Sequence, residues 1–297
     1  NLEEAVEIYG RILDIEEEVL GPDHVDLADT LQDLGLVRHK QGMLEETVAL
    51  YSHALMIKQK RLGKMHAFNA GILNNLGYVL CMIGELDRAE AMYSKALVIK
   101  EENLGPTHAS TSLTISNIAW LYCKQKEWDK SMQFYNRVMH IESERTGNSD
   151  GDPYIAKVLR DMARVRREEG KYEDAIGLYH RAINMLEKLY GQDLVSVASI
   201  LNAIGLLRFK QGRLDDAMYC FSRGLTIHDR VNPEHPNTAD MISNLAIVRK
   251  AQGDVEGALS DYRRCVQRYI AIHGSNHPRT QNAARQVRLL TWQKTAN

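Results

Sequence analysis

A pattern of small and aromatic residues recurs about every 42 residues, and it constrains the fold of this chain more than any other feature. In five copies a glycine is followed nine residues later by an aromatic residue, and in a sixth copy Lys126 replaces the glycine. The aromatic residues of the six copies are Tyr51, Tyr93, Tyr135, Tyr179, Phe221 and Tyr262. A period of this length indicates stacked copies of one supersecondary unit.

The residues around each aromatic position predict a pair of packed helices. A small residue precedes each aromatic by four positions, as Ala89 precedes Tyr93, and a slim residue such as Ala96 follows three positions later. Small side chains at helical spacing let two helices approach closely, and the aromatic ring fills the space beside them. A second helical pattern precedes each glycine, which permits the tight turn between the helices. Each unit is therefore a first helix (helix A), a turn, a second helix (helix B) and a loop.

Counting these units predicts an all-α chain of about 14 helices that forms a single solenoid over residues 1–297. The chain opens on a lone helix B, which suggests that it was cut from a longer protein. We expect a hinge or a plain surface insertion at residues 147–153, where one repeat is two residues longer. The predicted boundaries are a half repeat at 1–21, repeats at about 22–63, 64–105, 106–147, 148–191, 192–233 and 234–274, and a capping helix at 275–297.

These residues resemble the tetratricopeptide repeat over nearly the whole chain. The spacing A-x-x-x-Y-x-x-A-L-x-I at Ala89–Ile99 and the loop L-G-P-x-H at Leu104–His108 are similar to the kinesin light chain variety of that repeat. The resemblance implies a right-handed superhelical solenoid of antiparallel helix pairs. It also implies a concave groove, walled by helix A, that binds proteins.

Composition narrows the class of partner and compartment. Basic and acidic residues number 37 and 39, so the chain lacks the basic excess typical of a nucleic-acid binder. We therefore expect no nucleic-acid partner. The longest apolar run is far shorter than the ~20 residues that cross a bilayer, so we expect no membrane insertion. The four cysteines form no CxxC pair, which favours a reducing compartment. We expect a cytoplasmic protein, with cytoskeletal or ciliary association as a variant.

The sequence offers no catalytic or metal-binding constellation, and we expect neither an enzyme nor a cofactor. It contains no GxSxG, HExxH, P-loop or GxGxxG signature. Histidines recur in the loops between repeats, but equivalent positions of stacked repeats are roughly 10 Å apart, too far to share one metal ion. We expect these imidazoles to bond to the backbone where helices start. They are His24, His66, His108, His235 and His277.

The resemblance implies that helix A of each repeat contributes to a wall that faces the ligand. Asparagine recurs there, and its amide can pair with an extended peptide backbone or, alternatively, bond between neighbouring helices. Aromatic residues on the same wall could hold a bulky apolar anchor, although Trp120 could equally be a half-buried packing residue. The candidate groove residues of these two kinds are Asn75, Tyr78, Asn117, Trp120, Asn202, Phe209 and Asn244.

The fourth unit adds a basic stripe to this wall. Lys157, Arg160, Arg164 and Arg167 are spaced by three or four residues and therefore share one helix face. The apolar residues between them, such as Leu159 and Met162, must form the opposite, packed face. Such stripes are often merely solvated, but this one coincides with the ligand wall that the resemblance implies.

We therefore expect an adaptor or scaffold whose groove binds an acidic, extended segment with a bulky apolar anchor. One alternative is a structural spacer, in a cytoskeletal, ciliary or other large assembly, that docks by its edges or convex face. Another is a regulatory repeat region of a larger multidomain protein. The sequence carries no signal for an oligomeric state.

Overall fold

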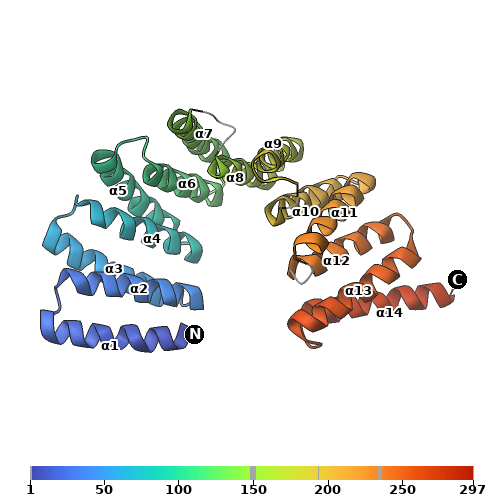
Figure 1. The fold of residues 1–297 in the computed structure, drawn as a ribbon, viewed down its shortest axis with the longest axis horizontal. Helices are drawn as coiled ribbons and strands as arrows, with labels where there is room; N and C mark the ends of the chain where they lie inside the picture. The colour runs from blue at the N-terminus through green and yellow to red at the C-terminus, as the bar shows by residue number, and fades with distance from the viewer. Residues whose placement is uncertain (1, 148–151, 193, 233–235, 297) are drawn as a thin grey trace. The chain divides into compact units, whose positions relative to one another are not determined.

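The structure, a computed structural model, describes residues 2–147, 152–192, 194–232 and 236–296. These residues form fourteen α-helices and no strand, so the predicted all-α repeat architecture is confirmed (Figure 1). The helices are α1 (Leu2–Leu20), α2 (Val25–Gln41), α3 (Leu44–Leu62), α4 (Ala67–Ile83), α5 (Leu86–Leu104), α6 (Ala109–Lys124), α7 (Trp128–Thr146), α8 (Pro153–Glu169), α9 (Tyr172–Tyr190), α10 (Val195–Lys210), α11 (Leu214–Val231), α12 (Pro236–Ala251), α13 (Val255–His273) and α14 (Pro278–Ala296).

The chain divides into two compact units, residues 1–152 (unit 1) and 153–297 (unit 2). Helices α1–α7 belong to unit 1 and helices α8–α14 belong to unit 2. The division falls beside the loop where the sequence predicts a hinge, but residues 148–151 of that loop lie outside the described residues. A single solenoid through both units stays a prediction.

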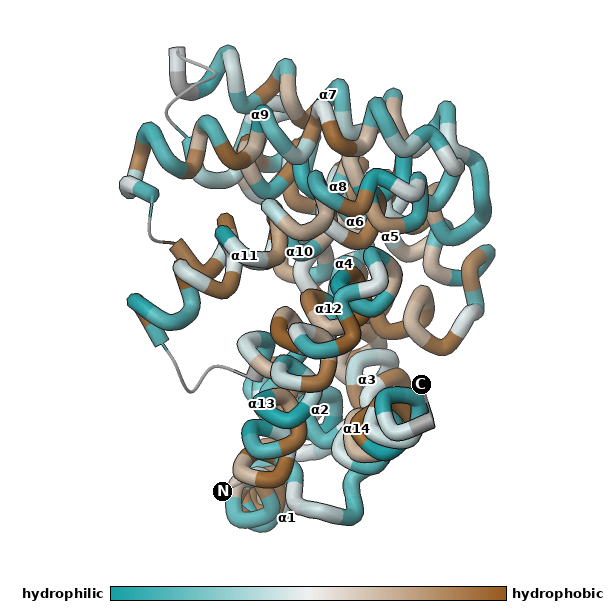
Figure 2. Tube along the Cα trace, turned by 90° about the vertical axis from the view of Figure 1, so that its right-hand side faces the viewer, coloured by the Kyte–Doolittle hydropathy of each residue, from teal (hydrophilic) through white to brown (hydrophobic). Residues whose placement is uncertain are grey.

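Within each unit, every even-numbered helix from α2 to α12 is a helix A that packs against the helix B following it. Hydrophobic and hydrophilic residues alternate along the helix traces in Figure 2. The six recurring aromatic residues line the interface between helix A and helix B, and each is at most 4% exposed. The core is therefore a row of repeated contacts.

Small residues are needed on helix A because the aromatic ring lies directly against its backbone. A Cβ atom added to Gly77 would lie 2.9 Å from Cδ1 of Tyr93, and one added to Gly205 would lie 2.6 Å from Cε1 of Phe221. Those separations are shorter than van der Waals contact between carbon atoms. The predicted role of the small residues is therefore confirmed.

The turn between helix A and helix B requires a left-handed backbone. The glycines that end helix A have φ between 75° and 89°, as expected from their place in the repeat. Lys126, which replaces the glycine in one unit, adopts φ 63° and is the sole non-glycine residue with positive φ in the described chain. This conformation costs a residue with a side chain roughly 1–2 kcal/mol. The repeat therefore keeps its turn at Lys126 at that cost in stability.

Loop histidines cap the following helices, as predicted from their position. His24, His66, His108 and His277 each accept a hydrogen bond at Nδ1 from the backbone N–H two residues later, over 3.0–3.3 Å. The acceptor satisfies one of the unpaired N–H groups that begin every helix. The fifth histidine of this set, His235, lies outside the described residues.

Candidate binding surfaces on helix A

In unit 1, an aromatic row crosses three successive helices A. The ring of Tyr78 in α4 stacks on Trp120 in α6 with 5.6 Å between centroids. It forms a T-shaped pair with His39 of α2, with 5.8 Å between centroids. Lys124 places its ammonium 5.4 Å from the centre of the Trp120 ring. Tyr78 is 39% exposed, whereas Trp120 is half-buried and also packs against the core. Both expectations for Trp120 therefore hold, since one part of its side chain packs against the core and another part is exposed.

Asparagines of the same wall bond between neighbouring helices. Asn117 of α6 donates from Nδ2 to Oδ1 of Asn74 in α4 over 3.0 Å, and the Thr114 hydroxyl donates to the same oxygen over 3.2 Å. Lys100 of α5 extends this network by donating to Thr114 Oγ1 over 2.8 Å. Lys100 is 6% exposed, and its burial lowers the pKa of its ammonium group. The inter-helix alternative is therefore what the structure shows for Asn117.

Asn75, the asparagine predicted to line the same wall as Asn117, is exposed, and its side chain makes no hydrogen bond within the described part of the chain. Asn74, one residue earlier, is 8% exposed and takes the structural role instead. A shift of one residue on a helix turns a side chain by about 100°, enough to exchange a buried position for an exposed one. The amide of Asn75 therefore remains available to a ligand.

In unit 2, the basic stripe of α8 lies opposite the packed face, as its spacing predicts. Val158, Leu159, Met162 and Val165 are at most 5% exposed. The positive charge of the stripe is, however, partly neutralised by acidic residues of the same helix. Asp161 lies 3.1 Å from Lys157 and 3.7 Å from Arg164, and Glu168 lies 2.7 Å from Arg167. Acidic residues of the same helix therefore compensate part of the charge of the stripe.

Arg160 is the member of the stripe that lacks an acidic partner among the described residues. Its guanidinium, with those of Arg164 and Arg167, acts on the buried phenol of Tyr179. Burial raises the pKa of Tyr179, and these three positive charges partly oppose that rise. Arg160 is therefore the open charge of the stripe, since no acidic side chain of the described residues pairs with it.

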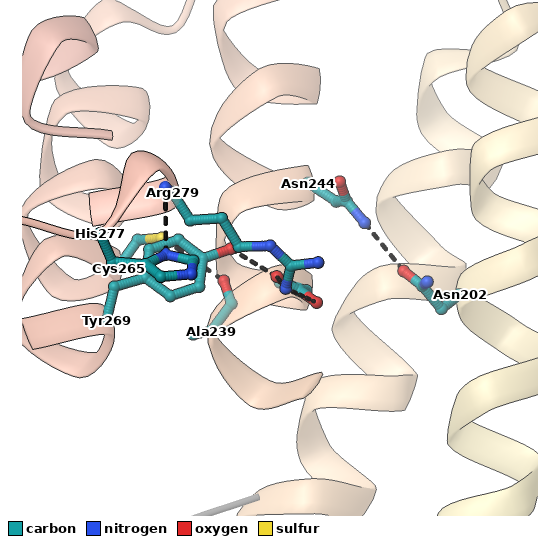
Figure 3. Close-up of polar contacts among 8 residues, drawn as sticks. Asn202, Ala239, Asn244, Cys265, Tyr269, His277 and Arg279 are labelled. Atoms are coloured by element: carbon teal, nitrogen blue, oxygen red, sulfur yellow. Dashed lines mark hydrogen bonds and ion pairs between the residues drawn. The ribbon is translucent and has the colours of Figure 1, made fainter. Parts of the chain in front are cut away.

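Farther along unit 2, a cavity of about 550 Å³ opens among α10, α12, α13 and α14. Asn244 of α12 donates to Oδ1 of Asn202 in α10 over 2.8 Å, which repeats the inter-helix bond seen in unit 1 (Figure 3). Arg279, whose side chain extends to the middle of Figure 3, belongs to α14 and donates to the carboxylate of Asp240 over 3.0 and 3.1 Å. Phe209, predicted for the same wall, is half-buried against the core of unit 2.

Tyr269 completes the cluster around Asp240. Its hydroxyl donates to Oδ1 of Asp240 over 2.5 Å. Burial, together with this bond, raises the pKa of the Tyr269 phenol. The carboxylate of Asp240 is thus held by a phenol from α13 and a guanidinium from α14, two helices that sequence reasoning left out of the site.

One recurrent signal could have revealed these additional residues. A single helix B position carries a polar side chain in most copies although it faces the core, and Lys100 and Tyr269 both occupy it. Polar groups at buried positions need hydrogen-bond partners, so each predicts a polar residue on a neighbouring helix A. The residues at this position are Glu16, Lys58, Lys100, Glu142, Leu186, His228 and Tyr269.

The described residues contain no group of three or more side chains arranged to hold a metal ion. The four cysteines are free thiols, and three of them are buried. Burial raises the pKa of the Cys81 and Cys220 thiols to about 11 and that of Cys265 to about 12. Because thiolate is the nucleophilic form, these three side chains are poor nucleophiles near neutral pH.

The successive packed helix pairs define the class of helical repeat proteins. The tetratricopeptide repeat family model matches residues 1–60, 68–141, 154–230 and 196–271, well over half of the chain. The chain belongs to the tetratricopeptide repeat family, whose repeats serve as protein–protein interaction scaffolds. Among the described helices, none combines the length and apolar character required to cross a membrane.

Relatives of known sequence match one part of the chain. Clustered mitochondria protein homologs are 25% identical over 112 residues in Danio rerio and 29% identical over 114 residues in Culex quinquefasciatus. Each match spans 37% of this chain and 8% of the relative's length. The chain therefore corresponds to a small part of these relatives.

Solved structures share the fold at low identity. A signal transduction ATPase with a tetratricopeptide repeat sensor from Pyrococcus horikoshii has a TM-score of 0.70 and 14% identity, over 97% of this chain and 41% of that one. A putative kinesin light chain from Podosopora anserina, with nearly identical TPR-like repeats, has a TM-score of 0.58 and 16% identity, over 70% and 97%. These likenesses concern the fold alone, and they include the kinesin light chain-like repeats that the sequence resembles.

Proposed function

We propose that the chain is a scaffold whose helix A wall binds extended segments of partner proteins, and that each unit has its own preference. The stripe of α8 in unit 2 takes acidic residues. The aromatic row of α2, α4 and α6 in unit 1 takes a bulky apolar side chain. The chain itself performs no catalysis in this proposal, and the cytoplasm is its compartment, which suits four free thiols.

Arg160 is the single observation that carries the acidic preference. Its three neighbours in the stripe already face Asp161 or Glu168, whereas Arg160 does not. A guanidinium binds a carboxylate through two parallel hydrogen bonds, a geometry that lysine cannot provide. An acidic side chain of a partner would therefore gain most at Arg160.

The apolar preference of unit 1 rests on surface that the row leaves exposed. Leu36 is 46% exposed and Met82 is 45% exposed, and both lie on the helices that carry His39 and Tyr78. An apolar side chain that covers such surface gains about 25 cal/mol per Å² removed from water. The exposed amide of Asn75, on α4, offers a hydrogen bond to the backbone of the same segment.

Reversing the open charge tests the acidic preference directly. With a synthetic peptide of Asp, Glu and Gly as the probe, we expect the double change Arg160→Glu and Arg164→Glu to weaken binding by about 2–3 kcal/mol at low salt. Arg160→Glu alone should account for most of the loss. Wild-type affinity should fall as salt rises, because exposed charge pairs are screened within ~10 Å. Calorimetric titration measures both effects.

Arg181→Glu is the matched control, since Arg181 is an exposed arginine of α9, a helix B. It should bind the acidic peptide almost as the wild type does. If the double variant binds that peptide as tightly as wild type at low salt, the acidic preference is wrong and a spacer that docks elsewhere is favoured.

The apolar preference is tested by Trp120→Ala with a neutral peptide that carries one central tryptophan. We expect a loss of about 1–2 kcal/mol from lost apolar contact, with the salt dependence unchanged. The circular dichroism spectrum should stay helical, because Trp120 is only half-buried. Equal affinity of wild type and variant for the tryptophan peptide would remove the row from the proposal.

A further inference from the structure

The cavity among α10, α12, α13 and α14 is separate from the α8 stripe, and its lining has a chemistry of its own. Its volume, about 550 Å³, lies within the ~300–1,000 Å³ typical of binding pockets. Amide and hydroxyl side chains line much of it, and aliphatic side chains line one part. The polar residues that do not carry charge include Asn202, Ser243, Asn244, Asn282 and Gln286.

Charge within this cavity is unevenly compensated. The carboxylate of Asp240 is neutralised by Arg279 and also accepts a bond from Tyr269, so it offers little to a cation. Lys250 donates to the amide oxygen of Gln286 over 3.1 Å and has no acidic partner among the described residues. The open charge of the cavity is therefore positive, and it lies at Lys250.

Leu206 and Ile247 share the cavity with Lys250 and are more exposed than core residues. They occupy equivalent positions on successive helices A, with 46% and 38% of their surface exposed. Both line the cavity. Aliphatic surface here replaces the aromatic surface that Tyr78 and Trp120 provide at the same repeat position in unit 1. The cavity therefore favours an aliphatic group next to an anionic group.

The amides indicate the backbone conformation of the occupant. Asn244 donates one side-chain N–H to Asn202 (Figure 3). The carbonyl oxygen and second N–H of the Asn244 amide, and the amino group of Asn202, remain available to bond a ligand. An extended peptide brings unpaired N–H and C=O groups that match such amides. A bound helix satisfies its own backbone and would leave the covered amides without partners, at a cost.

We propose that this cavity is a second binding site of unit 2, which takes an extended segment with an aliphatic side chain followed two residues later by a carboxylate. The aliphatic group contacts Leu206 and Ile247, and the carboxylate pairs with Lys250. Ile247 and Lys250 are neighbours on one face of α12, with Cβ atoms ~5–6 Å apart. Residues i and i+2 of an extended strand lie ~6.6 Å apart on one side, which matches that spacing. The inference rests on the proposed function, that helix A walls bind extended segments.

The test uses the whole chain and an acetylated, amidated peptide, Gly-Leu-Ser-Asp-Gly. In NMR spectra of the labelled chain, the side-chain amide signals of Asn202, Asn244 and Gln286 should shift on titration. We expect Lys250→Glu to weaken binding about tenfold or more, and the peptide with Asn in place of Asp to bind the wild type about tenfold more weakly. Ile247→Asn should reduce the affinity and erase the preference for Leu over Ala in the peptide.

The stripe variant Arg160→Glu separates this inference from the proposed function. It should bind Gly-Leu-Ser-Asp-Gly as the wild type does, while it loses the acidic peptide. Loss of both probes in Arg160→Glu would place the pentapeptide on the stripe and overturn the second site. So would unshifted Asn244 and Gln286 signals at millimolar peptide, or unchanged affinity of Lys250→Glu. If the wild type binds the pentapeptide but not the acidic peptide, the cavity is supported as a binding site and only the proposed role of the stripe is wrong.

Discussion

At the residue scale, neighbouring glycines of one helix have opposite requirements. Gly71 and Gly77 both lie in α4, but a Cβ atom at Gly71 would meet nothing within 4 Å, whereas one at Gly77 would strike the ring of Tyr93. Tyr93 is fully buried. Packing therefore requires glycine at position 77, whereas nothing in the structure requires it at position 71.

We predict that Gly77→Ala destabilises the chain by about 1–2 kcal/mol, because overpacking exceeds the gain in helix propensity. Gly71→Ala, the matched control, should stabilise it by about 0.5–1 kcal/mol. Urea denaturation followed by circular dichroism measures both changes. A stabilised Gly77→Ala variant would show that the contact between helix A and helix B is looser than described.

At the element scale, the loop histidine decides where helix A begins. Each described member of the set places its ring at the N-cap, and at His108 the bond from Nδ1 to the Ser110 N–H is the shortest, 3.0 Å. The bond uses the lone pair of the Nδ1 atom, so the histidine acts as a helix cap.

We predict that His108→Ala destabilises α6 by about 1 kcal/mol, the usual cost of losing an N-cap acceptor. His108→Asp should retain most of the stability, because its carboxylate can accept the same bond and suits the positive end of the helix. Thermal melts of the three proteins make the comparison. Alanine and aspartate variants that melt alike would mean that the imidazole contributes through packing instead.

At the scale of the whole molecule, stability is spread over contacts between successive helices. Within each unit, a helix packs mainly on the helices before and after it in the sequence. In such an array a local disturbance affects its neighbours first. Ala89, fully buried between α4 and α5, is a site where this can be measured.

We predict that Ala89→Leu destabilises unit 1 by about 1–3 kcal/mol through overpacking. Hydrogen exchange should accelerate in α4, α5 and α6 and stay unchanged in α12, α13 and α14. Peptide-resolved exchange with mass spectrometric readout separates these helices. Equal acceleration in both sets would indicate that the chain unfolds as a single cooperative body.

The 42-residue pattern by itself predicted the helices, their turns, the capping histidines and the buried aromatic contacts. These features depend on interactions within one repeat, between residues a few positions apart or on one helix pair, so local spacing is enough to specify them. The interleaving of Asp161 with the basic stripe was equally local, and helical spacing could have predicted it.

The polar contacts along the candidate helix A wall were decided by tertiary structure. Asn117 pairs with Asn74 and not with its repeat equivalent Asn75, and Asp240 meets Arg279 from 39 residues away. Such pairings depend on the offset and rotation between neighbouring helices, where one residue turns a side chain by about 100°. The repeat period specifies that the helices stack, but side-chain packing between neighbouring helices within each unit sets their rotation. That rotation determines which amides and charges remain open to a partner.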